Sequence, residues 1–369
     1  MNLSAIVRFG LVGIVSTASR LPAHAAQESI DSLLNKLPPP NQLVKPHVQQ
    51  ALADPALKDP LGDRIVSAPN PTAALNLARE FALNRPRSPF AHAMHGAAAM
   101  DAHEWGEAEQ ALRTSITLGS NNGFPNLLLG AVEMEQHRYG DALGPLQETN
   151  RLQPTWAAGW VLCSQCAVDL GHRDEAVAFA RRGTSIEPDW IYAWLQLGRA
   201  EKAAGHPLEM LNAVARAAAL APKDSTMQAI VGFGCINLNR IPQAIPPLER
   251  AAQIDYDDYL IQGQLGYCLE MTGQYAAAIT HLRKSITLNP NYGPGWQQLG
   301  FAYQRQGRHS EAIAAYERAT RIEPHSRLAW QNLAIEYRAV GRASDAARAQ
   351  AQLGGEEQKS QALIKSLTR

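Results

Sequence analysis

Residues 296–330 read WQQLGFAYQRQGRHSEAIAAYERATRIEPHSRLAW, and the pattern that starts at Trp296 starts again at Trp330, 34 residues later. In both copies a leucine follows the tryptophan after three residues, a tyrosine after seven and a glycine after eleven. Self-similarity at a fixed period of this size is typical of a solenoid in which every repeat is one helix-turn-helix unit. The stretch therefore predicts an all-α fold of stacked helix pairs.

The same period extends back through most of the chain. Small residues let the two helices of a pair approach closely, and they recur where close packing requires them. Steps of 34 residues through Gly300 reach the following small residues: Gly96, Gly130, Ser164, Gly198, Gly232, Gly266 and Ala334. A second series, in the later helix of each pair, consists of Ala108, Ala142, Ala176, Ala244, Ala278, Ala312 and Ala346, with Met210 as the exception. Eight repeats are predicted: 89–122, 123–156, 157–190, 191–224, 225–258, 259–292, 293–326 and 327–358.

Two further series mark the ends of the helices. A glycine in the left-handed conformation ends many helices, and the glycines that recur here are Gly171, Gly205, Gly273, Gly307 and Gly341. His137 and Asn239 take this position in two other repeats. Proline cannot continue a helix, and Pro86, Pro154, Pro188, Pro222, Pro290 and Pro324 are spaced to close the second helices.

Taken together, these residues resemble the tetratricopeptide repeat (TPR) family, and the resemblance covers roughly residues 70–369. It implies a right-handed superhelical solenoid that serves as a non-catalytic protein-binding scaffold. In that family the first helix of each repeat lines a concave binding face. The repeated tryptophans and tyrosines, such as Trp296 and Tyr303, are expected to be structural residues that pack one unit on the next.

The two ends of the chain differ from the repeats. Residues 1–25 hold a short apolar run followed by Ala23-His24-Ala25, a pattern typical of a cleaved secretory signal peptide. Residues 26–69 are rich in proline and are predicted to form an arm, and residues 70–88 a half-repeat that caps the first unit. Residues 356–369 are predicted to form a C-terminal capping helix. A periplasmic or secreted location follows from the signal peptide.

Charge and composition exclude several classes of partner. The chain has 34 Lys and Arg against 34 Asp and Glu, which gives a formal net charge of zero and a pI near 7.2. A nucleic-acid-binding protein usually carries a basic patch, and no such excess exists here. We expect protein or peptide partners, no nucleic acid and no membrane-spanning segment after removal of the signal. The oligomeric state stays open.

Residues capable of chemistry are few. Cys163 and Cys166 have the C-x-x-C spacing of a redox pair, but their position in the repeat is inside a helix, which favours buried small side chains. The sequence leaves open whether Cys235 and Cys268 form a disulfide. His92, His95 and His103 lie close to Glu104, but no zinc-binding motif accompanies them. We therefore expect no metal, no cofactor and no catalytic residue.

The positions that the resemblance assigns to the concave face change in character along the chain. Apolar side chains dominate the early repeats, and amide and basic side chains the later ones. The predicted binding residues are Phe90, Met94, Met100, Phe124, Leu127, Leu128, Met134, Tyr192, Arg199, Lys202, Phe233, Tyr267, Gln297, Phe301, Arg305, Gln331 and Arg338. The apolar stripe either binds an apolar peptide or is covered by the chain's own arm, and the sequence does not decide between these.

The functional hypothesis is a scaffold or adaptor that binds peptide segments of cell-envelope proteins. One alternative is an accessory or assembly subunit of an envelope enzyme or secretion complex. A remote alternative is a thiol-redox enzyme that uses Cys163 and Cys166.

Overall fold

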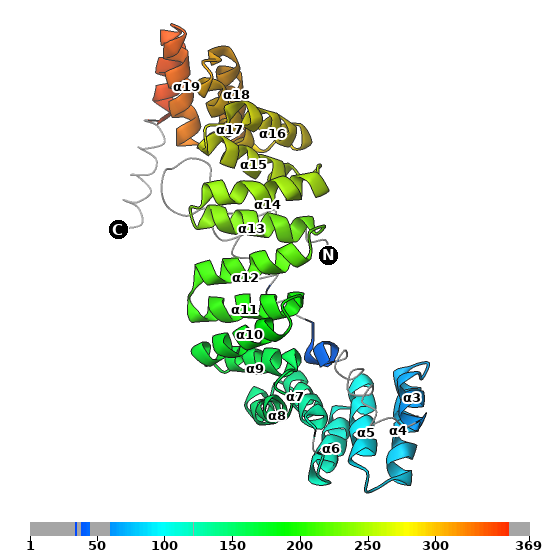
Figure 1. Ribbon diagram of the computed structural model, residues 1–369. Coiled ribbons are helices and arrows are strands. Elements are labelled where there is room, and N and C mark those ends of the chain that lie inside the picture. Colours follow the sequence, from blue (N-terminus) through cyan, green and yellow to red (C-terminus); the bar gives the residue numbers. More distant parts are fainter. Residues whose placement is uncertain (1–33, 35–37, 45–59, 121, 354–369) are drawn as a thin grey trace, which may run out of the picture. The chain divides into compact units, whose positions relative to one another are not determined.

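The structure is a computed structural model that describes residues 34, 38–44, 60–120 and 122–353. Every regular element in these residues is a helix, and successive helices pack on one another in pairs (Figure 1). The predicted all-α fold of stacked helix-turn-helix pairs is therefore confirmed. The predicted signal peptide and C-terminal capping helix lie outside the described residues, as does most of the predicted arm.

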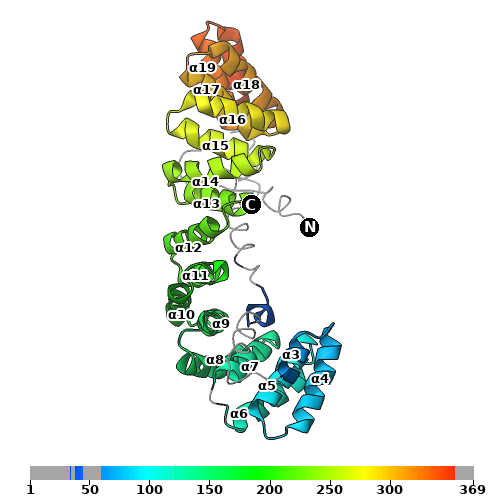
Figure 2. The same ribbon diagram turned by 45° about the vertical axis from the view of Figure 1, so that its right-hand side comes forward.

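The contacts between residues divide the chain into two compact units, with the boundary between Leu220 and Ala221. The N-terminal unit contains residues 34–44 and ten helices of the described chain: α3 Pro60–Val66, α4 Pro71–Asn84, α5 Pro89–Asp101, α6 Trp105–Thr117, α7 Phe124–Glu135, α8 Tyr139–Leu152, α9 Ala157–Asp169, α10 Arg173–Ile186, α11 Ile191–Ala204 and α12 Pro207–Leu220 (Figure 2).

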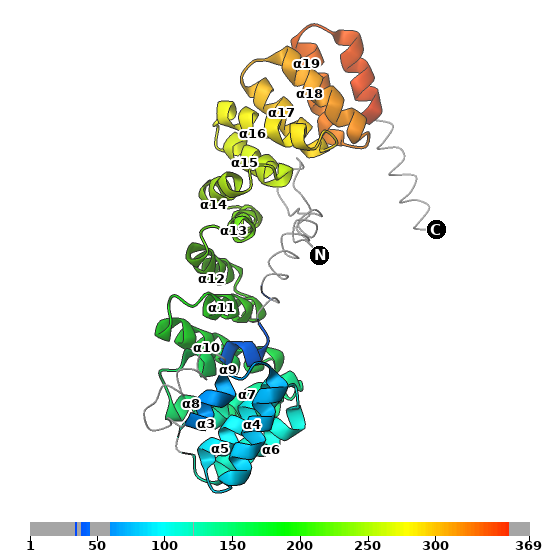
Figure 3. The same cartoon turned by 90° about the vertical axis from the view of Figure 1, so that its right-hand side faces the viewer.

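The C-terminal unit is built in the same way (Figure 3). Its helices are α13 Ser225–Asn237, α14 Ile241–Ile254, α15 Tyr259–Met271, α16 Tyr275–Leu288, α17 Gly293–Arg305, α18 His309–Ile322 and α19 Arg327–Ala339, followed by helical residues 343–353. From α5 onward the odd-numbered helices are the first helices of the pairs, and we call them A helices. The even-numbered helices are B helices.

The recurring glycines allow close contact between the A and B helices of a pair. A Cβ added to Gly96 would lie 2.4 Å from Cγ of Leu112, and one added to Gly130 would lie 2.4 Å from Cγ of Leu146. In the C-terminal unit the matching distances are 2.5 Å between Gly232 and Leu248 and 2.6 Å between Gly266 and Leu282. A leucine of the B helix thus occupies the space that a side chain would need. This confirms the predicted role of the small residues.

The left-handed turn between the A and B helices occurs in every pair. The predicted glycines have positive φ, between 72° at Gly307 and 81° at Gly205. His137 and Asn239 adopt it too, with φ of 59° and 57°. His103 completes the series with φ of 59°, although its residue type alone groups it with the other histidines near Glu104. Its offset of 34 residues from His137 identifies it as a turn residue.

Candidate functional site

The apolar A-helix face of the N-terminal unit is buried rather than open. Met94, Met100, Phe124, Leu127, Leu128 and Met134 are each no more than 2% exposed, and Phe90 is half-buried. These side chains belong to one hydrophobic cluster that also contains Leu43 and Val44 from outside the repeats. Their role in binding stays a prediction, and a partner could reach them only by taking the place of what covers them.

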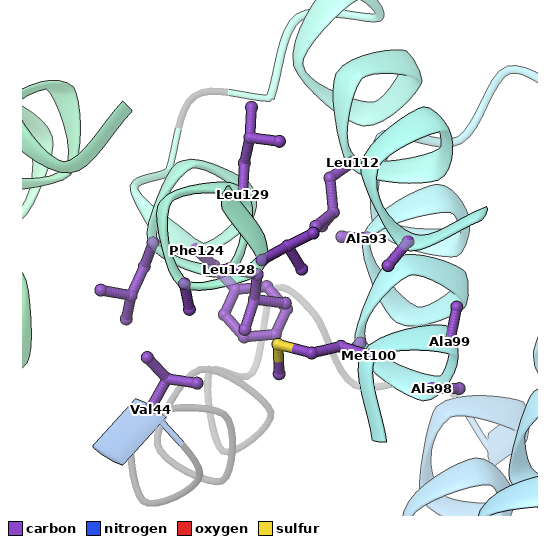
Figure 4. Close-up of a cluster of buried hydrophobic side chains, with 14 of the residues drawn as sticks. Val44, Ala93, Ala98, Ala99, Met100, Leu112, Phe124, Leu128 and Leu129 are labelled. Carbon is purple, nitrogen blue, oxygen red and sulfur yellow. The ribbon is translucent and has the colours of Figure 1, made fainter. Parts of the chain in front are cut away.

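A short segment of the predicted arm lies on this face. Residues 40–44 form one helical turn, in which Leu43 and Val44 are 2% and 0% exposed (Figure 2). Figure 4 shows Val44 pointing toward α7, from which Phe124 and Leu128 project, with Met100 of α5 beside them. The backbone N–H of Asn41 donates a hydrogen bond of 3.2 Å to Oε1 of Glu135, the last residue of α7. Side chains and backbone of the segment are therefore both engaged.

Leu34 makes a second contact further along the same unit. It is 1% exposed, and its Cδ2 lies 3.1 Å from the place that a Cβ would take on Gly198 of α11. From Leu34 to Val44 the segment thus passes from α11 to α7, against the order of the repeats. Of the two alternatives for the apolar stripe, the structure shows the chain's own residues on it.

A cavity of about 380 Å³ lies at the first repeat of the same unit. Its lining includes Met94, Ala97 and Met100 of α5 on one side and Ile65 and Ala74 of α3 and α4 on the other. This volume is at the lower end of the range for small-molecule pockets. Two of the predicted binding residues, Met94 and Met100, therefore reach this cavity.

The corresponding face of the C-terminal unit is polar. Gln264, Gln297 and Gln298 are each no more than 5% exposed, and both amide atoms of Gln298 lack a hydrogen-bond partner among the contacts of the described residues. Glu270 is also buried, and desolvation raises the pKa of its carboxyl to about 8. Unpaired buried polar groups are costly, and they are satisfied when a ligand supplies the missing partners. Gln297 is one of the predicted binding residues, whereas Glu270 is not, although it lies at the same repeat position as Met100 and Lys202.

The remaining predicted binding residues vary in accessibility. Phe233 and Tyr267 are buried and Phe301 is half-buried, whereas Tyr192 is 38% exposed. Gln331, Arg305 and Arg338 are exposed, and Lys202 is half-buried. Two of the arginines already have partners: Nη2 of Arg199 lies 2.6 Å from Oδ1 of Asp169, and Nε of Arg305 donates to the Tyr275 hydroxyl at 3.0 Å. The exposed positions are those that a partner contacts without any rearrangement.

The four cysteines are free and buried. Cys163 and Cys166 are both 0% exposed within α9, and the amide of Asn150 donates to Sγ of Cys163 at 3.3 Å. Burial raises the pKa of the Cys163 thiol and raises that of Cys166 to about 12. A nucleophilic cysteine needs a low pKa and access to its substrate, so this environment disfavours the thiol-redox alternative.

The histidines near Glu104 make contacts with other residues of the fold. Nε2 of His95 lies 2.6 Å from Oε1 of Glu107, and Nε2 of His92 lies 3.0 Å from the carbonyl oxygen of Pro86. His103 stacks edge-on against Trp105. No group of His, Cys, Asp or Glu with the geometry of a metal site occurs among the residues that the structure describes.

The repeated tryptophans join a repeat to the turn before it, which adds a hydrogen bond to the structural role expected of them. Each is half-buried, and its indole N–H donates to the carbonyl six residues earlier. The donor–acceptor distances are 3.1 Å for Trp160 and Pro154, 2.7 Å for Trp194 and Pro188, 2.9 Å for Trp296 and Pro290, and 2.8 Å for Trp330 and Pro324. His92 makes the equivalent contact to Pro86, and Gln262 makes it to Tyr256 at 3.0 Å. In these six repeats the position carries an N–H donor, which is not always an indole.

Comparison with protein families identifies the repeat. Residues 261–292 and 293–336 match two models of the tetratricopeptide repeat. Both matches lie in the C-terminal unit, and the helix pairs, the small residues and the turns continue the same period through the N-terminal unit. The chain therefore contains tetratricopeptide repeats, and such repeats form scaffolds for protein–protein interaction.

Similar solved structures include those of MamA, of YrrB and of a Cut9–Hcn1 hetero-tetramer. A crystal structure of MamA is 23% identical, covers 45% of this chain and 97% of its own, and has a TM-score of 0.43. YrrB, described as a TPR protein with an unusual peptide-binding site, is 17% identical over 50% of this chain and 95% of its own, with a TM-score of 0.41. The Cut9–Hcn1 hetero-tetramer of APC/C is 14% identical over 90% of this chain and 62% of its own, with a TM-score of 0.36. No curated protein matches the chain.

None of the helices in the described part of the chain has the length and apolar character needed to cross a membrane. The described helices that carry the candidate site are amphipathic helices of a stacked repeat, and their apolar residues pack on one another.

Proposed function

We propose that this chain is an exported, non-catalytic adaptor that binds peptide segments of cell-envelope proteins on the A-helix faces of its repeats. The observation that supports this most directly is the segment 40–44, which lies on the A-helix face of the N-terminal unit with two buried side chains and one backbone hydrogen bond. A surface that receives a segment from outside the repeats has the shape and chemistry needed to receive a peptide.

The two units suit different partner chemistry. Methionine and leucine side chains adapt to varied apolar residues, so the N-terminal unit suits an apolar segment. Glutamine side chains pair with both the N–H and the C=O of a peptide bond, so the C-terminal unit suits the backbone of an extended segment. Gln298, with two unpaired buried amide atoms, is the residue best placed for such a contact.

The proposal is tested by photo-crosslinking from defined positions. A photoreactive phenylalanine analogue replaces Tyr192 on α11 or Ile335 on α19, which are 38% and 48% exposed at A-helix positions. The matched control is Ile254 at the end of the B helix α14, which is 42% exposed. We expect discrete crosslinked proteins from an envelope extract at Tyr192 or Ile335 and none at Ile254. Equal crosslinking at all three positions would contradict binding on the A-helix faces.

Export is tested separately. We propose removal of residues 1–25, so that the mature protein begins at Ala26 in the periplasmic or secreted fraction. N-terminal sequencing of the protein from fractionated cells measures this. Recovery of a chain that retains Met1 in the cytosolic fraction would contradict it.

A further inference from the structure

We propose that Leu34 and residues 38–44 form a built-in competitor for the apolar A-helix face of the N-terminal unit, and that the partner bound there carries the same pattern of apolar residues. This inference rests on the proposed function and adds the class of partner and its regulation. The segment makes three kinds of contact, at Leu34, at Asn41 and at Leu43 with Val44.

The first contact depends on a departure from the repeat pattern. In four repeats the small residue of the A helix faces a leucine of the B helix: Leu112, Leu146, Leu248 and Leu282. At Gly198 the B helix offers the shorter Val214, whose Cγ2 lies 3.3 Å from the Cβ position, and Leu34 lies beside it at 3.1 Å. Leu34 therefore fills the volume that a leucine of the B helix fills elsewhere. The repeat and the segment are complementary at this point.

The second contact covers the apolar stripe. Leu43 and Val44 belong to the same cluster as Met100, Phe124 and Leu128, all almost completely buried. Burial of leucine and valine side chains is favourable, so removal of the segment would expose apolar surface at considerable cost. The segment thus buries apolar side chains against the stripe, as a bound peptide ligand would.

The third contact does not depend on which side chain the residue at position 41 carries. A backbone N–H, that of Asn41, donates to the carboxylate of Glu135. Any non-proline residue supplies this donor, so the pattern needed in a partner is set by the apolar residues alone. The partner class is a segment with one leucine at its start and an adjacent apolar pair nine and ten residues later.

Covalent connection gives the built-in segment an advantage over a free peptide. Residues 45–59 connect Val44 to α3 of the same unit, and a short connection raises the effective concentration of a tethered ligand to the millimolar range. A free partner of equal intrinsic affinity therefore binds weakly to the wild-type chain. Loss of the tethered contacts should increase its apparent affinity.

The test uses a fluorescent synthetic peptide with the sequence of residues 33–45 and the full mature chain. In the chain, L43D and V44D place two carboxylates at positions that are buried on the stripe. We expect this variant to bind the peptide at least about tenfold more tightly than wild type, by fluorescence anisotropy. A peptide that carries the same two substitutions should not bind. L83D, at an 80% exposed position of α4, is the matched control and should bind the peptide as wild type does.

A second variant acts from the other side of the contact. V214L restores the leucine that four sister repeats have at this position, so the fold should tolerate it, while Leu34 loses its space. Because the peptide carries its own leucine at this place, V214L combined with L43D and V44D should bind the peptide more weakly than the aspartate variant alone. Circular dichroism verifies that each variant keeps the helical content of wild type.

Three results would overturn the inference. Equal affinity of wild type and the aspartate variant would show that the segment does not compete. Absence of binding to every variant would show that the stripe does not recognise this pattern, while crosslinking from Tyr192 or Ile335 would still support the adaptor function. A wild-type dimer that dissociates in the aspartate variant, measured by light scattering, would assign the segment to a second copy of the chain.

Discussion

The two units share a 34-residue period but differ in the face that their A helices present. In the N-terminal unit this face carries Met94, Met100 and Phe124 and is covered by residues 40–44. In the C-terminal unit it carries buried Gln264, Gln298 and Glu270. The positions that hold one helix against another are the same in both units, whereas the A-helix face is free to vary. The repeat therefore fixes the scaffold and leaves the choice of ligand to a separate set of positions.

The largest expected effect comes from variants that disrupt the helix packing of one unit at a time, because they test whether the two units unfold independently. Gly130→Val places a branched side chain where Leu146 lies 2.4 Å from the Cβ position, and Gly266→Val does the same against Leu282 at 2.6 Å. We expect each to lower the free energy of unfolding of its own unit by about 3 kcal/mol. Urea titration followed by circular dichroism, with limited proteolysis to locate the unfolded unit, measures this.

The control for this pair is Gly144→Ala in α8, where a Cβ meets nothing within 4 Å. It should stabilise the N-terminal unit by about 0.5–1 kcal/mol, because alanine favours the helix. If both valine variants moved one common transition by the same amount, the two units would unfold as one cooperative body.

pH should affect the units in opposite directions. Burial raises the pKa of Glu270 to about 8, so the folded C-terminal unit holds a proton that the unfolded chain releases at a lower pH. Its stability should therefore fall as pH rises from about 4.5 to about 8. In the N-terminal unit a hydrogen bond from Arg79, together with His95, lowers the pKa of Glu107 to about 2. That contribution is present above about 4.5 and is lost as pH falls toward 2.

Glu270→Gln should remove the pH dependence of the stability of the C-terminal unit without changing the shape of the side chain. We expect it to stabilise the C-terminal unit by roughly 3 kcal/mol at pH 9 and to have little effect at pH 5. Thermal unfolding across this pH range provides the measurement. A variant that followed the wild-type profile at every pH would show that Glu270 is not the group responsible.

The tryptophan contacts should have a smaller effect, similar in both units. Trp160→Phe and Trp330→Phe keep an aromatic ring but remove the N–H that donates to Pro154 or Pro324. Each should cost about 1 kcal/mol in the free energy of unfolding. Trp330→Gln tests the role of the donor, because Gln262 makes this contact in its own repeat. Glutamine should retain more stability than phenylalanine; the reverse order would indicate that ring packing matters more.

The smallest effect is expected at the left-handed turns. His103→Gly in the N-terminal unit should stabilise by about 0.5 kcal/mol, because histidine strains this conformation more than glycine does. Asn239→Gly in the C-terminal unit should change stability by less than about 0.3 kcal/mol, because asparagine tolerates positive φ. Chemical denaturation of the two variants side by side measures the difference. A larger gain at Asn239 than at His103 would be inconsistent with this account.

Much of the fold was accessible from the sequence because the period repeats physical requirements at fixed offsets. The close contact at Gly130 and the turn at Gly205 follow from the glycine at that position of the repeat. His103 escaped notice because its residue type suggests chemistry, while only its offset shows that it belongs to a turn. The tryptophans were identified as structural, but their hydrogen bonds could not be foreseen without the position of the preceding carbonyl.

The candidate site was less predictable. The change from apolar to amide side chains along the A-helix faces was visible in the sequence, and what the structure adds is that Met94 and Phe124 are buried, as are Gln264 and Gln298. The cover over the apolar end was one of two open alternatives. Its placement depends on the space beside Gly198 that Val214 leaves and Leu34 fills, and such complementarity between distant residues leaves no periodic signal.

The hydrogen bond from the fourth residue of a repeat to the carbonyl six residues earlier is made by Trp, His and Gln in this one chain. These side chains differ in size, charge and aromaticity, and they share only a nitrogen donor within reach of that carbonyl. Substitution among Trp, His and Gln at this position keeps the hydrogen bond to the turn, but it removes the tryptophan that makes such repeats recognisable in the sequence. Degenerate units are therefore better found by asking which residues can donate than by asking which residues look alike.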